Sequence, residues 1–325
     1  MYIVFLFIIF IIGIVLIIKG GDYVVDVCGK LSDVTGIHET LIGSTLTSVA
    51  TTLPELTITI LAMMQDSPQI VVGNGLGTIL VNICLVLGLS LSFMSLKRFN
   101  KTTINKLIFL TVVQSILVLL LIFKFLNIYS GILLLFIFTL YFIKTFFDIK
   151  NSLLSKGKIN IDNPIEKPKV KNIDKILLIL KFVVGSLFIF AGAQFIINAT
   201  EELSIKLKIS QTLIALIIIA VATSLPELVT TITSIKKKRL NLALGNVIGS
   251  NIINCTLLFG LSGVLSGINS LVLSNSEIAI ILPTILFASL LLAFPILLKK
   301  RTYRWQGYML ISLYLIYTFI IILCG

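Results

Sequence analysis

The chain has 325 residues, of which 57% are hydrophobic and only 12% are charged, and its mean hydropathy is +1.11. A soluble core could not bury so much apolar side chain, so lipid must be the solvent. The formal net charge of +12 would also suit a nucleic-acid-binding protein. That class is excluded because the basic residues gather at one end of the apolar segments. We expect a protein embedded in a lipid bilayer, with no nucleic-acid partner.

Ten apolar segments are long enough to cross a bilayer, which takes about 20 residues. The first has no basic stretch before it and no small-residue cleavage site after it, so we expect it to stay in the protein as a span. The ten segments are residues 2–19, 40–64, 70–95, 104–125, 128–147, 175–198, 211–235, 241–266, 277–298 and 303–323. The sequence therefore predicts an all-α integral membrane protein with ten transmembrane helices.

The distribution of charge predicts the orientation of these spans. If the N-terminus lies outside, 22 of the 26 basic residues fall in internal loops or at internal span ends. Because cytoplasmic loops carry an excess of Lys and Arg, both termini are expected outside. The longest polar segment, residues 148–174, is predicted to be a cytoplasmic linker loop. The four cysteines and the single histidine form no cluster, so we expect neither a disulfide nor a zinc site.

The chain also contains an internal repeat. At an offset of 172 residues, segment 41–90 aligns without a gap with segment 213–262, and 19 of the 50 positions are identical. Each half holds five spans, an odd number, so the second copy must enter the membrane from the opposite side. We predict two inverted five-helix repeats, residues 1–147 and 175–325, with the repeated motifs at 40–90 and 212–262. Inverted repeats of this kind are typical of secondary transporters.

Glu55 and Glu227 occupy matching positions in the two repeats and are the only acids, of 14, that lie deep in apolar segments. A carboxylate at that depth costs several kcal/mol unless it is compensated, so its default interpretation is functional. Glutamates that serve helix packing alone are the alternative, and their symmetric placement disfavours it. Pro54 and Pro226 precede them and are predicted to break the helices there, which would free carbonyl oxygens as ligands.

Polar side chains at helical spacing accompany both glutamates. Thr51 shares a face with Glu55, and Thr223 shares a face with Glu227. Oxygen ligands without His or Cys suit hard cations such as Na⁺ and Ca²⁺. Two carboxylates match the charge of one Ca²⁺, and their alternative occupation by Na⁺ or protons would couple the two fluxes. The sequence thus indicates a transporter that needs no cofactor and is not an enzyme, with a channel, a membrane enzyme or a scaffold as the competing classes.

Two paired motifs resemble a known family. Residues 50–55 and 222–227, followed by residues 73–78 and 245–250, are similar to the two alpha repeats of the cation/Ca²⁺ exchanger superfamily, most closely to the prokaryotic, archaeal-type Na⁺/Ca²⁺ exchangers. The resemblance implies Na⁺/Ca²⁺ antiport by alternating access across a prokaryotic cell membrane, with spans 2, 3, 7 and 8 holding the ions while spans 1 and 6 slide across them.

By motif position, the resemblance also implies which residues hold each ion. The Ca²⁺ ligands would be Glu55, Glu227, Thr51 and Thr223. The Na⁺ ligands would be these four residues together with the Ser48 and Ala220 carbonyls, Thr52, Thr78, Ser224 and Ser250, while Asn82 and Asn254 would flank the centre.

The motifs depart from the family pattern at three positions. Asn254 stands where archaeal relatives can carry Asp, and Ala50 and Ala222 stand where Gly is usual. Asparagine at both central positions also resembles the K⁺-independent animal exchangers, and that resemblance implies that no K⁺ is required. A Ca²⁺/H⁺ exchanger, with the two glutamates carrying protons, is the second hypothesis, and the many hydroxyl oxygens favour Na⁺ over it. The sequence leaves the oligomeric state open, a monomer included.

Overall fold

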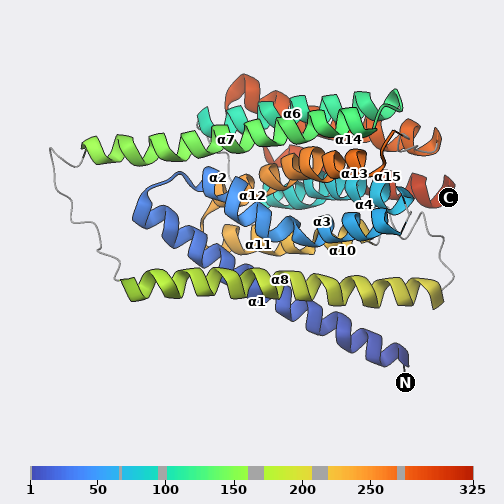
Figure 1. The fold of residues 1–325 in the computed structure, drawn as a ribbon, viewed down its shortest axis with the longest axis horizontal. Coiled ribbons are helices and arrows are strands. Elements are labelled where there is room, and N and C mark those ends of the chain that lie inside the picture. The colour runs from blue at the N-terminus through green and yellow to red at the C-terminus, as the bar shows by residue number, and fades with distance from the viewer. Residues whose placement is uncertain are drawn as a thin grey trace.

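The computed structural model describes residues 2–65, 68–93, 101–159, 172–206, 219–268 and 275–324. They form a bundle of helices, most of which run along one direction, with α1 tilted across the bundle (Figure 1). Short π-helical turns, labelled η, interrupt some of the helices.

The first half contains α1 (Tyr2–Thr35), α2 (Glu39–Ile42), η1 (Gly43–Thr47), α3 (Ser48–Met64), α4 (Pro68–Val81), η2 (Asn82–Leu87), α5 (Gly88–Phe93), α6 (Lys101–Ile122) and α7 (Ile128–Ile159). The second half contains α8 (Asn172–Lys206), α10 (Ala220–Thr223), α11 (Leu225–Lys236), α12 (Leu240–Ile253), η4 (Asn254–Leu258), α13 (Phe259–Leu265), α14 (Asn275–Lys299) and α15 (Arg304–Cys324). The predicted all-helical class is confirmed for the described residues.

Within the described residues, eight helical runs are long and apolar enough to cross a membrane. They are Phe5–Thr35, Glu39–Met64, Ile70–Phe93, Lys101–Ile122, Ile128–Leu154, Ile176–Ala199, Leu240–Leu265 and Ala279–Lys299. The predicted span 211–235 lies partly outside the described residues, and the predicted span 303–323, which coincides with α15, is not among the eight.

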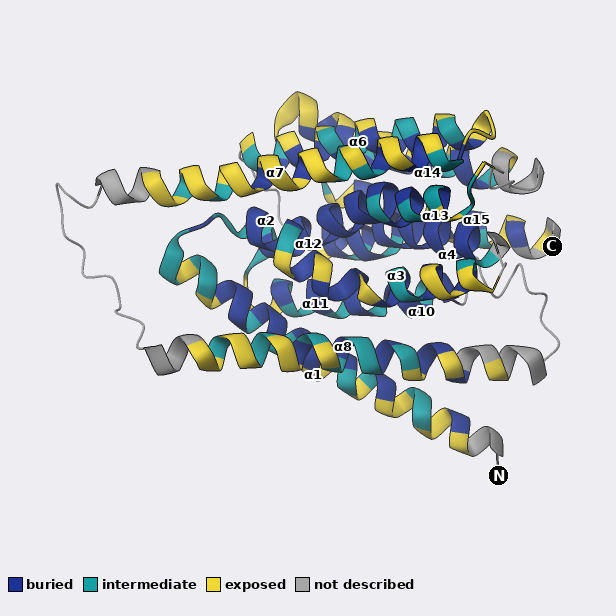
Figure 2. Ribbon diagram, in the orientation of Figure 1, coloured by how far each residue is buried: buried dark blue, intermediate teal, exposed yellow. Residues whose placement is uncertain are grey.

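The helices are layered by burial. Figure 2 shows α4 and α12 buried along most of their length, whereas α7 and α8 alternate between buried and exposed residues. The exposed positions on the outer helices are largely apolar, among them Phe7 on α1, Phe136 on α7 and Leu177 on α8. Apolar side chains on the outside and polar ones inside are the arrangement that a lipid solvent requires.

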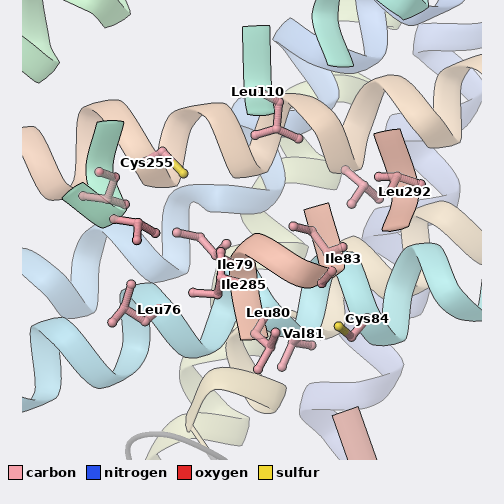
Figure 3. Packing of buried hydrophobic residues seen from close by; sticks show 14 of the residues in the cluster. Leu76, Ile79, Leu80, Val81, Ile83, Cys84, Leu110, Cys255, Ile285 and Leu292 are labelled. Carbon is pink, nitrogen blue, oxygen red and sulfur yellow. The ribbon is translucent and has the colours of Figure 1, made fainter. Parts of the chain in front are cut away.

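A packed apolar core lies beside the central helices. Ile79 and Ile83, from α4 and η2, lie near Leu110 of α6 and Leu292 of α14 (Figure 3). One buried hydrogen bond, 2.7 Å from Ser289 Oγ to Gln114 Oε1, joins α14 to α6. Interhelical hydrogen bonds of this kind contribute about 1 kcal/mol in membranes. Close packing therefore fixes the position of α4 against its neighbours.

Helices in the two halves begin and end at matching residues. Shifted by the 172-residue offset of the repeat, α4 coincides with α12, and α3 covers the same interval as α10 and α11 together. The π-helical turns η2 and η4 both begin at the paired asparagines, Asn82 and Asn254. The described parts of the repeated motifs thus share most of their helix bounds and the π-helical turns at Asn82 and Asn254.

Helices α1 and α8 cross at paired glycines. A Cβ atom added to Gly20 would lie 2.5 Å from the Gly185 carbonyl oxygen, and one added to Gly13 would lie 2.7 Å from that of Gly192. The residues at positions 13 and 20 are related to those at 185 and 192 by the same 172-residue offset. Small residues let two helix backbones approach closely in a membrane, where van der Waals contact replaces the hydrophobic driving force.

The predicted linker loop is wrong in part. Helix α7 continues to Ile159 and α8 begins at Asn172, so residues 148–159 and 172–174 of the predicted loop are helical. The cause is that elongating an existing helix is easy, and residues 148–159 contain no proline to stop α7. Residues 160–171 lie outside the described part of the chain.

Candidate cation-binding site

Glu55 lies within α3, which follows α2 and η1 without a break. The helix passes through Pro54, so the prediction that Pro54 breaks it is wrong. Proline removes one N–H and leaves the Ala50 carbonyl without its usual donor, but the surrounding hydrogen bonds and packing hold the helix together. The Glu55 side chain is 0% exposed, and its backbone carbonyl accepts a 3.4 Å hydrogen bond from Asn74 Nδ2 of α4.

Glu227 lies in the first turn of α11, and here the helix is interrupted. A one-residue turn at Ser224, with φ −80° and ψ −1°, separates α10 from α11, although the backbone hydrogen bond from Leu228 N to the Ser224 carbonyl still spans it. Pro226 then sits in the first turn of α11, a position where its missing N–H costs nothing. The predicted interruption therefore occurs in the second repeat only, two residues before the proline.

Thr51 is the centre of one hydrogen-bonded network. Its Oγ1 lies 3.3 Å from each of three oxygens: the Ser48 carbonyl, Asn246 Oδ1 and Ser250 Oγ. The last two belong to α12, which comes from the other half of the chain. The network therefore joins the first repeated motif to the second.

Thr223 is the centre of the matching network. Its Oγ1 lies 3.1 Å from the Ala220 carbonyl, 3.2 Å from Thr78 Oγ1 and 3.3 Å from Asn74 Oδ1. Each partner corresponds, at the 172-residue offset, to a partner of Thr51. Two equivalent oxygen clusters thus face each other across the repeats.

The two carboxylates differ in their partners. Glu227 Oε1 accepts hydrogen bonds from Ser250 Oγ at 3.1 Å and Thr52 Oγ1 at 3.4 Å. Neither carboxylate oxygen of Glu55, nor Oε2 of Glu227, accepts a hydrogen bond from the described residues. Buried acceptors without donors are costly unless a cation or water meets them.

The other predicted ligands are also buried. Thr52, Thr78 and Ser250 make the contacts above, while the Ser224 hydroxyl and the side-chain amides of Asn82 and Asn254 have no hydrogen-bond partner among the described residues. All of these side chains are at most 1% exposed. Hydrogen bonds thus join Thr51, Thr52, Thr78, Thr223, Glu227 and Ser250 across α3, α4, α10, α11 and α12, whereas Ser224, Asn82 and Asn254 are buried without such a contact.

Three further polar residues were not predicted as ligands. Asn74 and Asn246 sit on the predicted polar stripes and contact Thr223 and Thr51. Asn251 is fully buried, its amide has no described partner, and its counterpart in the first repeat is Ile79. The signal available for Asn251 was an asparagine in an apolar span. It was not predicted as a ligand because it has no polar counterpart in the first repeat.

Ion pairs connect α1 to the central helices at one end of the bundle. Lys237, after α11, lies 2.8 Å from both Asp22 and Asp26 of α1, and Asp26 also pairs with Lys181 of α8 at 2.9 Å. Arg239 pairs with Asp33 at 2.5 Å. The hydrogen bonds to Asp33 raise the pKa of Arg239 above its ordinary value. These contacts bridge the outer α1–α8 pair and the helices that carry the oxygen clusters.

The arrangement suits a hard cation. The side chains that surround the two glutamates supply hydroxyl, amide and carbonyl oxygens, which Na⁺ and Ca²⁺ prefer. Two carboxylates on separate helices can share one divalent ion, whereas a monovalent ion can bind beside each of them. One buried cluster can therefore accept either kind of ion but not both fully.

Known proteins resemble the chain over nearly its whole length. The family described as sodium/calcium exchanger protein matches residues 5–147 and 177–323. MaX1, a sodium/calcium exchanger of Methanosarcina acetivorans, is 30% identical and covers 95% of this chain and 96% of its own length. MJ0091, an uncharacterized membrane protein of Methanocaldococcus jannaschii, is 28% identical over 94% of this chain and 95% of its own. The solved structure of the sodium-calcium exchanger NCX_Mj, soaked with Na⁺ and no Ca²⁺, gives a TM-score of 0.78 at 25% identity, covering 97% of this chain and 98% of its own.

Proposed function

Because the chain belongs to the sodium/calcium exchanger protein family, we infer that it exchanges Na⁺ for Ca²⁺ across a membrane and binds both ions in the buried cluster around Glu55 and Glu227. It is therefore a transporter rather than an enzyme. Its location is the cell membrane of a prokaryote, as expected for a multi-pass chain whose relatives include archaeal membrane proteins.

The observation that carries the site is the pair of matching networks around Thr51 and Thr223. Each network places a backbone carbonyl and an amide oxygen within 3.3 Å of a threonine hydroxyl, next to a fully buried glutamate. Ca²⁺ binds between the carboxylates of Glu55 and Glu227, and Thr51 and Thr223 are its other ligands. Na⁺ binds with the same residues and the flanking oxygens of Ser48, Thr52, Thr78, Ala220, Ser224 and Ser250.

Exchange follows from this shared set of ligands. A Ca²⁺ ion and a full set of Na⁺ ions compete for the same two carboxylates. On either side of the membrane, the site therefore releases one kind of ion when it binds the other. The α1–α8 pair slides across the central helices and exposes the cluster to one side at a time. An ion-free cluster would hold two buried and unbalanced carboxylates, which opposes sliding without cargo.

The proposed architecture is ten spans in two inverted repeats with both termini outside. The matching helix bounds support the repeat, and both ends of the chain lie at the same end of the bundle (Figure 1). Helix α11 runs toward the opposite end, where Lys237 and Arg239 follow it, in agreement with the positive-inside rule.

A flux measurement tests the function. Purified protein in liposomes loaded with Na⁺ should take up radioactive Ca²⁺ when diluted into Na⁺-free buffer, and equal Na⁺ on both sides should abolish the uptake. The Ca²⁺/H⁺ alternative predicts uptake that follows a pH gradient in the complete absence of Na⁺. That result would reject Na⁺ coupling while leaving the Ca²⁺ site intact.

A further inference from the structure

A second polar cavity lies away from the cation site. Its volume is about 450 Å³, and it opens between α6, α7 and the start of α2. Most of the residues that line it are polar or charged by type, among them His38, Lys101, Asn105, Lys106, Lys144, Thr145, Asp148 and Asn151. The exchange mechanism uses none of these residues.

Lys106 is the unusual member of this wall. Its side chain is only 6% exposed, and Nζ donates to two neutral oxygens, Tyr141 Oη at 3.1 Å and Thr145 Oγ1 at 3.2 Å. Nζ also lies 4.6 Å from the centre of the Tyr141 ring. No carboxylate of the described residues lies within the 4.0 Å ion-pair distance of Nζ. The nearby Asp148 offsets the desolvation of this buried ammonium only in part, because its carboxylate lies beyond ion-pair distance.

The rest of the wall adds to the positive charge. Lys101 and Lys144 are exposed cations at the rim, and Asp148 is the only acid among the described residues that line the cavity. Lys101 also begins the 22-residue helix α6, whose first N–H groups and dipole favour an anion. Asn105 and Asn151 supply neutral amide donors. The cavity therefore combines three cations and several donors with a single competing acid.

Lys106 is connected to the central helices by two hydrogen bonds. Tyr141 accepts from Lys106 and donates to the Ser44 carbonyl at 3.1 Å. Ser44 belongs to η1, which leads directly into α3 and its Ser48 carbonyl. Lys106 is thus held in a fixed position, which reduces the entropy lost when a ligand binds.

We propose that this cavity binds a phosphate-class anion between Lys101, Lys106 and Lys144. The third N–H of Lys106, which has no acceptor among the described contacts, donates to the anion, and the two exposed lysines close over it. Either free phosphate or the phosphate of an anionic phospholipid carries this chemistry. The lipid source fits the exposed apolar surface beside the cavity, at Ile108 of α6 and Phe142 of α7.

Thermal unfolding in detergent tests the site. Inorganic phosphate is titrated in one arm, and phosphatidylglycerol or phosphatidylcholine is added to the micelles in the other. We expect a saturable rise in Tm with phosphate or phosphatidylglycerol, and none with phosphatidylcholine. A response to phosphatidylglycerol alone assigns the occupant as a lipid, and competition between the two assigns a shared phosphate site. No saturable response to either compound in the wild-type chain would overturn the proposal.

Variants identify the residues. Lys106→Gln should abolish the response, and the double variant Lys101→Gln/Lys144→Gln, which changes exposed residues only, should weaken apparent binding about 10-fold or more. Lys150→Gln is the matched control, because Lys150 is exposed on α7, the helix that carries Lys144, but does not line the cavity. If Lys106→Gln fails to fold, the Tm response of the double variant to phosphate and phosphatidylglycerol tests the site instead. An unchanged response in the double variant would overturn the site.

Discussion

Glu55 and Glu227 occupy equivalent positions, yet only Glu227 is hydrogen-bonded through its carboxylate within the described residues. Ser250 and Thr52 orient Oε1 of Glu227, whereas the Glu55 carboxylate has no such support. In the proposed site, a bound cation would therefore be the main partner of the Glu55 carboxylate. The two acids should contribute unequally to ion binding even though the repeat places them alike.

We expect Glu55→Gln and Glu227→Gln each to lower Ca²⁺ affinity about 100-fold or more. Each change removes one of the two negative charges that balance a divalent ion, in a region where water cannot compensate. Equilibrium binding of radioactive Ca²⁺ to the purified protein measures the effect. Glu202→Gln, at an exposed residue, is the control. Unaltered Ca²⁺ binding in both buried variants would refute the assigned site.

Thr51→Val should weaken Ca²⁺ binding about 10-fold, because it removes the hydroxyl that contacts Ser48, Asn246 and Ser250 while keeping the shape of the side chain. Thr51→Ser retains the hydroxyl and should stay close to the wild type. The same binding assay applies to both. Equal losses in the two variants would mean that packing, and not the oxygen, matters at this position.

At the scale of helices, paired glycines bring the backbones of α1 and α8 close together, and these two helices move in the proposed mechanism. Gly20→Ala should lower Tm and slow exchange, because its Cβ would lie 2.5 Å from a backbone carbonyl that cannot rotate away. Gly21→Ala is the neighbouring control, since its Cβ would meet side-chain atoms of Val229 at 3.1 Å, which can adjust. Unfolding curves and flux are measured together. Identical behaviour of the two variants would argue against tight glycine packing.

The ion pairs of Lys237 join α1 to the end of α11 and should act on motion more than on stability. Both partners are partly exposed, with side-chain exposures of 32% for Lys237 and 44% for Asp22, and such pairs contribute about 1 kcal/mol or less. We expect Lys237→Gln to leave Tm nearly unchanged but to alter the Ca²⁺ exchange rate. Lys236→Gln, at the preceding exposed residue, should do neither. The double variant Asp22→Lys/Lys237→Asp should restore the wild-type rate if this contact is responsible.

For the whole molecule, the proposed orientation predicts where the C-terminus lies. Alkaline phosphatase folds only outside the cytoplasm, so we expect a C-terminal fusion to it to be active in a bacterial host, while a fusion of green fluorescent protein should remain dark. A fusion after residue 159, at the end of α7, should give the opposite pattern. Reversed signals at both points would show that the chain inserts the other way.

The all-helical fold could be predicted from the sequence because the membrane penalises the features involved, while the residues of the candidate site stay a prediction. Buried acids such as Glu55, the repeated motifs and the one-sided lysines stand out against an apolar background. The course of α3 through Pro54 could not be predicted, because it depends on packing against neighbouring helices. The ion pairs of Lys237 and the position of Lys106 depend on which helices meet, which local patterns do not contain.

The two halves match at Thr51 and Thr223 but not everywhere. Thr230, whose Oγ1 accepts a 2.8 Å hydrogen bond from Asn246, corresponds to Ile58, and Asn251 corresponds to Ile79. A perfectly symmetric carrier would have mirror-image states of equal free energy when open to either side. The unmatched polar side chains in the second half remove that equality. We therefore expect the half-saturating Ca²⁺ concentration for exchange to differ between the two faces of the protein.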